Sequence, residues 1–355
     1  MQIHATNVHG LGACQVVISF LDSFQRSSNL SSTNIYLPSY GTLSKYNSSK
    51  LNTIFYNRFL PNAFSRVFEC IFSRLFFSDT ATIVLGDIPL RGISDQVVLV
   101  HQPNLIYPKI NQYSSRSLIF RINRFLFSIN QRFAKKIIVQ TGAMAKQMIA
   151  SYPKIKDKII ICPQPIPNWF SIEDVNCKKR IDPQKLYLFY PAMYYPHKKH
   201  NFLIDVEAYC RKHNYNLNNY EIWLTLDDED FNQFKKIKYV KNLGILNQDE
   251  MHHYYMKANA LLFLSSMESY GLPIVESLTM NLPIIIADFE YSRWLCEESA
   301  LYFKPYDEHS FIIALDKLKD ELIINSNRNY SHLTDKFPKS WDNVVDVFLN
   351  ALESY

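Results

Sequence analysis

The chain has 355 residues, of which 47% are hydrophobic and 20% charged, so it has the length of two domains and the composition of a globular protein. Its net charge of +5 is too small to argue for nucleic acid as a partner. No apolar run reaches the roughly 18 residues that span a bilayer, and no basic and then apolar segment follows Met1. We therefore expect neither a transmembrane helix nor a signal peptide.

Short apolar runs alternate with longer amphipathic stretches through the first half of the chain. We expect strands at 2–6, 33–37, 82–85, 97–100 and 136–140. We expect helices around 14–26, 58–77, 116–133 and 142–151. This alternation predicts a parallel, doubly wound α/β sheet.

The same alternation returns in the second half, after a polar stretch punctuated by proline. Here we expect strands at 185–191, 221–226, 260–264, 283–287 and 301–303. We expect helices near 199–212, 249–257, 271–279 and 307–318, and an amphipathic tail helix at 341–352. The predicted domains are 1–168 and 185–338, joined by a linker at 169–184 and followed by a terminal helix at 339–355.

The cysteines show neither a C-x-x-C pair nor the spacing of metal ligands. They are Cys14, Cys70, Cys162, Cys177, Cys210 and Cys296. Reduced thiols in a cytoplasmic protein are the simplest interpretation of this usage.

The most informative segment runs from Glu268 to Glu276, across a Gly-Leu-Pro turn. The run before it is typical of a buried strand and the run after it of a helix, so Glu268 should lie at a strand's carboxyl end. Ligands of open α/β sheets bind at this edge, where a helix N-terminus offers N–H groups to a diphosphate. Two carboxylates beside an anion site suit sugar and ribose hydroxyls. The alternative is a solvated helix face that carries two acids.

This segment resembles the E-x7-E motif of retaining family-4 glycosyltransferases of the bacterial surface-polysaccharide type. The likeness extends to 242–251, 254–258, 282–288 and 300–305, and covers about 185 to 320 well. Tyr270 replaces the usual Phe, and Leu264 a frequent Pro. The resemblance implies the GT-B fold, in which two Rossmann-like domains face a cleft and a C-terminal helix crosses back to the N-terminal domain.

The resemblance also implies a cation at the donor diphosphate. Residues 195–201 are similar to the family's "pHKN" segment, which makes Lys198 the diphosphate ligand. Lys199 stands where an Asn is usual. Where the family often has an arginine this chain has Met193, Tyr194 and Tyr195, so one cation of the donor site is missing or is replaced by Lys199. A lysine beside a helix N-terminus stabilises charge on a departing nucleotide. The alternative is a solvated lysine pair.

On the same resemblance the acids and the turn between them bind the remaining donor groups. Glu276 holds the ribose hydroxyls and Glu268 the sugar hydroxyls, while the amides of Gly271 and Leu272 face the diphosphate. Ser269 and Tyr270 complete the predicted donor-binding set, as the residues between Glu268 and the turn.

Four residues of the first half are assigned to the cleft. Gly10 and Gly12 follow the first strand and match the family's glycine-rich loop, although Gln15 at the third glycine position argues against a dinucleotide fingerprint. His101 ends a strand where the family often has a histidine that contacts the donor sugar. Asp87 lies in a loop at the cleft rim, near the acceptor. Thr141 is expected to be a structural N-cap.

The function implied is retaining transfer of a hexose from a nucleotide-sugar to a glycan, with no metal or other cofactor required. The acceptor is expected to be lipid-linked, in O-antigen or capsule synthesis. The acids at 227–230 contain a D-x-D, a metal-binding signature of the other large glycosyltransferase fold, but the matched family tolerates any polar loop here, and the acids could equally cap the next helix. Two rivals remain: an inverting GT-B enzyme, and a non-catalytic membrane-associated scaffold of a glycan-assembly complex.

A basic, acid-free stretch at 116–136 interleaves cations with Leu, Ile and Phe. Basic amphipathic helices commonly lie on anionic lipid. We therefore expect a cytoplasmic protein that binds peripherally to the inner face of the cytoplasmic membrane. Arg58, Arg66 and Arg74 add a candidate second face. The alternative is a core helix whose exposed side is basic.

Overall fold

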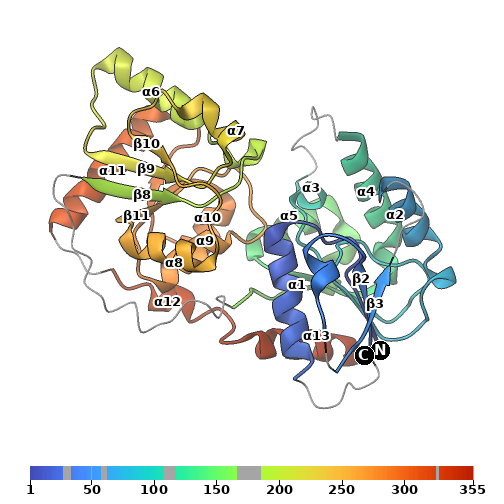
Figure 1. Cartoon of the computed structure of the whole chain (residues 1–355). Coiled ribbons are helices and arrows are strands. Elements are labelled where there is room, and N and C mark those ends of the chain that lie inside the picture. The colour runs from blue at the N-terminus through green and yellow to red at the C-terminus, as the bar shows by residue number, and fades with distance from the viewer. Residues whose placement is uncertain are drawn as a thin grey trace. The chain divides into compact units, whose positions relative to one another are not determined.

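The chain folds into two compact units (Figure 1). The computed structural model describes residues 1–26, 33–48, 50–56, 62–107, 117–165, 185–324 and 328–354. The first unit combines Met1–Pro165 with Pro338–Tyr355, and the second is Ile166–Phe337. The predicted linker at 169–184 lies outside the described residues.

The first unit is built on a seven-stranded, fully parallel sheet in the order β3-β2-β1-β4-β5-β6-β7. Its strands are β1 (Gln2–His4), β2 (Asn34–Pro38), β3 (Asn52–Tyr56), β4 (Thr82–Val84), β5 (Gln96–Leu99), β6 (Ala134–Val139) and β7 (Ile159–Ile161). Sequence analysis missed β3 and β7. Both are edge strands: β3 begins with two polar residues and is partly exposed, and β7 is apolar but only three residues long and not fully buried.

Helices cover both faces of this sheet. The longer ones are α1 (Leu11–Phe24), α2 (Asn62–Ile71), α4 (Ser117–Asn130), α5 (Gly142–Ser151) and α13 (Trp341–Glu353). The short ones are α3 (Pro103–Ile106), η1 (Thr42–Lys45), η2 (Ser73–Leu75), η3 (Gln131–Phe133) and η4 (Pro153–Lys158). Because strand side chains alternate, Val97 enters the core under α1 and α13, whereas Val98 enters the core under α2, α4 and α5.

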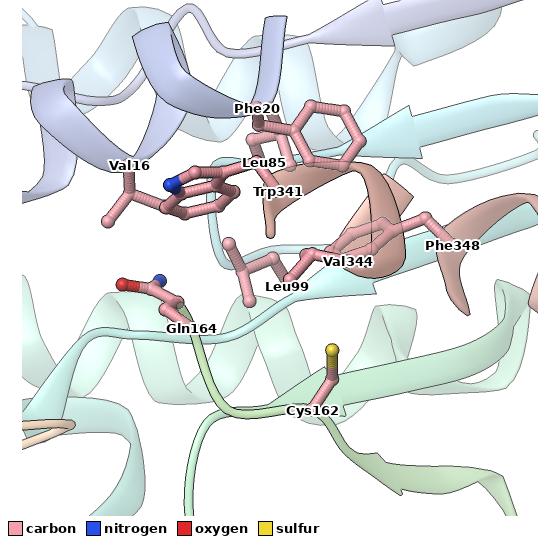
Figure 2. Close-up of a pocket in the computed structure, with 9 residues that line it drawn as sticks. All are labelled: Val16, Phe20, Leu85, Leu99, Cys162, Gln164, Trp341, Val344 and Phe348. Carbon is pink, nitrogen blue, oxygen red and sulfur yellow. The ribbon is translucent and has the colours of Figure 1, made fainter. Parts of the chain in front are cut away.

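The tail helix α13 packs on α1, so the expectation that the C-terminus returns to the first domain is confirmed. The rings of Phe348 and Phe20 meet edge to face with centroids 4.9 Å apart. Figure 2 shows Trp341 and Phe348 beside Phe20 around a small apolar cavity. At the start of α13, the Asp342 carboxylate accepts hydrogen bonds from Arg26, at 2.9 Å, and from Ser23.

The second unit has a six-stranded parallel sheet in the order β10-β9-β8-β11-β12-β13. Its strands are β8 (Leu186–Tyr190), β9 (Tyr220–Leu224), β10 (Val240–Asn242), β11 (Ala260–Phe263), β12 (Ile284–Ala287) and β13 (Leu301–Phe303). The five expected strands are confirmed within a few residues. The sixth, β10, is a short edge strand that sequence analysis missed.

Helices lie on both sides of this second sheet (Figure 1). They are α6 (Phe202–His213), α7 (Asp228–Phe231), α8 (Gln248–Lys257), α9 (Leu272–Thr279), α10 (Glu290–Cys296), α11 (Glu308–Ile323) and α12 (Ser331–Thr334), with η6 (Pro196–Lys198) and η7 (Asn232–Phe234). The predicted doubly wound α/β class is therefore confirmed. No helix in the described ranges has the length and apolar character needed to cross a membrane.

The docking of α13 predicts a large stability effect from one ring. Phe348→Ala should lower the free energy of unfolding by about 3–5 kcal/mol, because it removes a buried aromatic side chain and leaves a cavity. Asp346→Ala, at an exposed position of the same helix, should change it by less than about 0.5 kcal/mol. Urea denaturation followed by circular dichroism measures both. Equal losses from the two variants would show that α13 is not part of the folded core.

Candidate functional site

Two neighbouring strands of the second sheet deliver the candidate site. β8 and β11 pair in parallel, so their carboxyl ends meet at the same sheet edge. The loop after β8 contains Lys198, and the loop after β11 contains Glu268. The Lys198 Nζ lies 2.5 Å from Glu268 Oε1, and both side chains are more than four-fifths buried. Residues 70 positions apart in the sequence thus form one partly buried ion pair.

Backbone contacts lock the two loops together. The carbonyl of His197 accepts a hydrogen bond from the Ser266 N–H at 2.7 Å and from the Ser266 hydroxyl at 3.1 Å. The buried Tyr190 hydroxyl donates to the Lys198 carbonyl at 2.5 Å. These bonds fix the backbone of Lys198 relative to the loop that carries Glu268, so the ammonium group is held in place before any ligand arrives.

The two lysines carry the positive charge of this segment, because the adjacent histidines have lowered pKa values. Burial and the nearby Lys198 lower the pKa of His197 to about 4. The same causes lower the pKa of His200 to about 3. Lys199 has a left-handed backbone with φ of 54°, and its Nζ lies 5.3 Å from the centre of the Tyr306 ring. The two lysines therefore make different contacts, and Lys198 makes the one with Glu268.

The Gly-Leu-Pro turn shapes the start of α9. Gly271 has φ of 79°, a left-handed conformation that favours glycine, and an added Cβ would lie 2.9 Å from Ile274 Cδ1. No side chain caps this helix end, and its first turn holds no acid within the described residues. The N–H groups of a first turn have no acceptor within their own helix. The positive end of α9 thus opens at the same sheet edge as Lys198 and Glu268.

Glu276 lies inside α9 and is only 5% exposed. The hydroxyl of the fully buried Tyr255, on α8, donates to Glu276 Oε2 at 2.6 Å. Burial raises the pKa of Glu276 to about 7, and the hydrogen bond from Tyr255 opposes that rise. A carboxylate kept at such a pKa costs folding stability when it ionises, which is typical of a functional rather than a structural group.

Sequence analysis missed Tyr255 and its bond to Glu276. Positions 251, 255 and 258 follow the spacing of one helix face, and this signal separates the buried Tyr255 from the half-buried Tyr254 beside it. The contact with Glu276 has no signal in the sequence. Of the other predicted donor-binding residues, Ser269 is half-buried in the loop, and Tyr270 is 3% exposed with its ring centre 6.2 Å from that of Phe337.

In the first unit, Gly10, Asp87 and His101 follow the carboxyl ends of β1, β4 and β5, which are neighbours in the sheet. Gly10 is the N-cap of α1, and Gly12 lies in its exposed first turn. Asp87 is buried, with φ of 71°, and one carboxylate oxygen accepts the N–H groups of His101 and Gln102 at 2.7 and 2.8 Å. The carboxylate of Asp87 therefore orients the turn that presents His101.

Two capping roles expected from the sequence are confirmed. The Thr141 hydroxyl accepts the N–H of Met144 at 3.1 Å, as an N-cap of α5 does. Asp227, in the D-x-D stretch, caps α7 by accepting the N–H of Asp230 at 2.8 Å. Within the described ranges, no three His, Cys, Asp or Glu side chains gather as metal ligands do.

Comparison with known proteins shows which family this part of the chain resembles. Residues 171–331 match the family model of glycosyl transferases group 1, and that match includes Lys198, Glu268 and Glu276. The matched residues lie within the second unit, and they make up somewhat less than half of the chain. The fold of the whole chain agrees, because WaaG, a glycosyltransferase involved in lipopolysaccharide biosynthesis, superposes with a TM-score of 0.72 at 12% identity, over 98% of this chain and 99% of WaaG. HepE of Anabaena, solved with UDP and glucose, gives 0.68 at 14% identity, over 100% and 99%. The GT-B fold predicted from the sequence is confirmed.

Curated relatives of this glycosyltransferase-like chain are mannosyltransferases. The O-antigen chain mannosyltransferase RfbU of Salmonella typhimurium is 23% identical over 206 residues, which are 55% of this chain and 54% of RfbU. The serotype-specific mannosyltransferase WbdA of Escherichia coli is 32% identical over 69 residues, 19% of this chain and 8% of WbdA. In these matches the chain spans about half the length of RfbU and a small part of WbdA.

The turn before α9 predicts a difference between two glycines. Gly271→Ala forces both a left-handed alanine and a clash with Ile274, whereas Gly244→Ala, at φ of 76°, meets nothing within 4 Å. We expect Gly244→Ala to cost about 1–2 kcal/mol of stability from backbone strain alone. Gly271→Ala should cost about 1 kcal/mol more, because overpacking adds to the strain. Chemical denaturation measures both variants, and equal losses would contradict the tight packing at this turn.

Proposed function

We propose that this chain is a retaining glycosyltransferase that moves a hexose from a nucleotide-sugar to a glycan acceptor. The observation that carries the proposal is the Lys198–Glu268 ion pair, set beside the uncapped positive end of α9. A group-1 domain and a GT-B fold support the same class of reaction. A cation, a helix N-terminus and a carboxylate at one sheet edge suit a ligand that joins a diphosphate to a polyol.

The diphosphate is assigned to the positive groups. Lys198 approaches it as an ammonium ion, and the N–H groups of Gly271 and Leu272 donate to its oxygens. Lys199 is assigned to the same donor as a second cation. Because the backbone of Lys198 is fixed by Tyr190 and Ser266, its charge needs little reorganisation when the donor binds.

The neutral hydroxyls of the donor are assigned to the acids. Glu268 exchanges part of its contact with Lys198 for the sugar hydroxyls, and Glu276 accepts hydrogen bonds from the ribose hydroxyls through the oxygen that Tyr255 leaves unused. Ser269 and Tyr270 hold the loop between them. His101 of the first unit is assigned to the donor sugar, and Gly10, Gly12 and Asp87 to the acceptor side.

The proposed reaction keeps the configuration of the sugar. The bond between the anomeric carbon and the β-phosphate oxygen breaks while the acceptor oxygen bonds to the same face of that carbon. The acceptor proton passes to the departing phosphate oxygen, so the protein supplies no general base. Its contribution is orientation, together with stabilisation of the leaving diphosphate by Lys198 and α9. The proposal requires no metal ion.

The acceptor class is inferred from the relatives. RfbU is named for the O-antigen chain, and WaaG for lipopolysaccharide biosynthesis. We infer a glycan acceptor of bacterial surface polysaccharide that is carried on a lipid. Such an acceptor would hold the enzyme at the cytoplasmic face of the membrane, in line with the basic stretch at 116–136.

A donor screen tests the proposal. Melting temperature is measured with UDP-, GDP- and ADP-sugars, because a true donor stabilises the folded protein by mass action. One class of nucleotide-sugar should raise the melting temperature. Lys198→Ala should abolish that rise and lower kcat by about 100- to 1,000-fold. Lys212→Ala, an exposed lysine on α6, is the matched control.

Activity and product configuration then separate the alternatives. NMR of the product should show the anomeric configuration of the donor, and an inverted product would favour the inverting mechanism. Glu268→Ala should abolish transfer. If no donor class binds and Glu268→Ala leaves function intact in cells, the chain is a scaffold and not an enzyme.

The Tyr255–Glu276 contact predicts a pH dependence. Ribose hydroxyls donate to the ionised carboxylate, so the KM for the donor should fall as pH rises through about 7 and level off above it. Tyr255→Phe removes a hydrogen bond that lowers the pKa of Glu276, so this transition should move to higher pH. Tyr254→Phe, at the adjacent residue, should leave the profile in place. A KM that does not vary with pH in any variant would argue against Glu276 as the ribose ligand.

A further inference from the structure

The first unit exposes a set of large apolar side chains on two neighbouring helices. We call this set the α2–α4 apolar face. From α2 and the residues around η2 it includes Phe64 (73% exposed), Phe68, Phe72, Leu75 (73%) and Phe76. From α4 it includes Leu118, Ile119 and Phe125. Apolar side chains that gather on an exposed surface commonly mark an interaction site.

Helical spacing makes this face continuous. Phe64, Phe68 and Phe72 recur every four residues and so lie on one side of α2, and the ring centres of Phe68 and Phe72 are 4.6 Å apart. The helices α2 and α4 contact each other and run side by side in Figure 1. The amide of Asn130 at the end of α4 donates to the carbonyl of Cys70 at 3.0 Å, which fixes the end of one helix against the other.

The fold does not need these side chains for its core. The inward sides of the same helices already supply Cys70, Leu126 and Phe127 to the buried cluster over the sheet. Both helices are therefore apolar on two sides, one facing the sheet and one facing outward. A structural role explains the inner side only.

Charge distinguishes a lipid surface from other partners. No Asp or Glu occurs between Asp95 and Asp157, and the acid of α2, Glu69, is buried against His4 at 2.6 Å. Arg121 is exposed among the apolar residues of α4. Near the ends of α4 and α5 a surface pocket is lined by three exposed cations and no acid, namely Arg91, Arg132 and Lys154. Exposed apolar groups with cations around them complement anionic lipid.

The basic stretch at 116–136 alone does not form this surface. Arg116 lies outside the described residues, and Arg124 donates to the carbonyl of Asn104. Lys135 belongs to β6 and pairs with Asp95 at 3.1 Å. The exposed apolar residues of α2 and η2, distant in sequence, supply most of the outward surface instead.

We propose that the α2–α4 apolar face inserts into the headgroup region of an anionic bilayer, and that Arg91, Arg132 and Lys154 bind lipid phosphates beside it. Phe64 and Leu75 are the most exposed residues of this face. This proposal names the surface that would hold the protein at the membrane, and its biological purpose rests on the membrane location proposed above. It depends on the first unit alone, so it can fail while donor binding in the second unit survives.

Vesicle co-sedimentation of the full chain tests the proposal, with phosphatidylcholine vesicles made with or without phosphatidylglycerol. The chain should bind the anionic vesicles, and Phe64→Ser with Leu75→Ser should weaken binding at least about tenfold, because burial of apolar side chains drives insertion. Leu118→Ser with Phe125→Ser, a second pair from α4, should weaken it similarly. The matched control is Ile323→Ser with Ile324→Ser, which are 72% and 77% exposed in the second unit and should bind like the parent chain.

The cations are tested separately. Arg132→Ala with Lys154→Ala should weaken binding to anionic vesicles and reduce its dependence on salt, since screening acts on exposed charges. All variants should keep the parent melting temperature and its shift with donor, which shows that fold and donor site are intact. Failure of the parent chain to bind either vesicle overturns the proposal. The proposal is also overturned if the Phe64→Ser, Leu75→Ser double variant binds vesicles as well as the parent chain does. It is likewise overturned if the parent chain binds no vesicles but forms a dimer in solution that this double variant disrupts.

Discussion

The candidate site depends on the parallel pairing of β8 with β11. That pairing brings two loop ends to one sheet edge and allows Lys198 to meet Glu268 at 2.5 Å. The serine hydroxyl and amide bonds to the His197 carbonyl then hold the two loops in register. In the free protein the Lys198 ammonium group and the Glu268 carboxylate form an ion pair. On the proposed function, a bound diphosphate would contact the ammonium group and the hydroxyls of a sugar would contact the carboxylate. The same contact stabilises the fold and prepares the site.

Burial controls the second acid of the motif. Glu276 lies within α9, where its carboxylate accepts a hydrogen bond from the hydroxyl of Tyr255 and burial raises its pKa to about 7. A stability-driven sequence would place an apolar residue there. A buried acid that ionises lowers the stability of the folded protein, and hydrogen bonds from a ligand would compensate for that loss. The lower stability of the free protein and its proposed affinity for the donor therefore have one physical origin.

The first unit uses the two faces of its sheet differently. In the first unit α13 fills one face of the sheet, and the ring of Phe348 against Phe20 completes that core. On the other face α2 and α4 bury their inner sides and leave Phe64, Leu75 and Phe125 outside. The stretch without acids between Asp95 and Asp157 and the pocket lined by cations add positive charge to this outer side, although Arg74 of η2 is paired with Asp79.

The sequence by itself determined the alternation of strands and helices, and with it the fold class, because periodicity and length reflect local burial. It also placed Glu268 and Gly271 at a strand–turn–helix junction, and Thr141 at a helix start, since these depend on neighbours in the chain. The edge strands β3 and β10 contain polar residues that interrupt an apolar run, and the apolar run of β7 is only three residues long, so the sequence did not identify these strands. Only the tertiary structure paired Lys198 with Glu268 and Tyr255 with Glu276, and only it turned the apolar side of α2 outward. Each of these depends on which distant segments become neighbours, and no local pattern of residues encodes that choice.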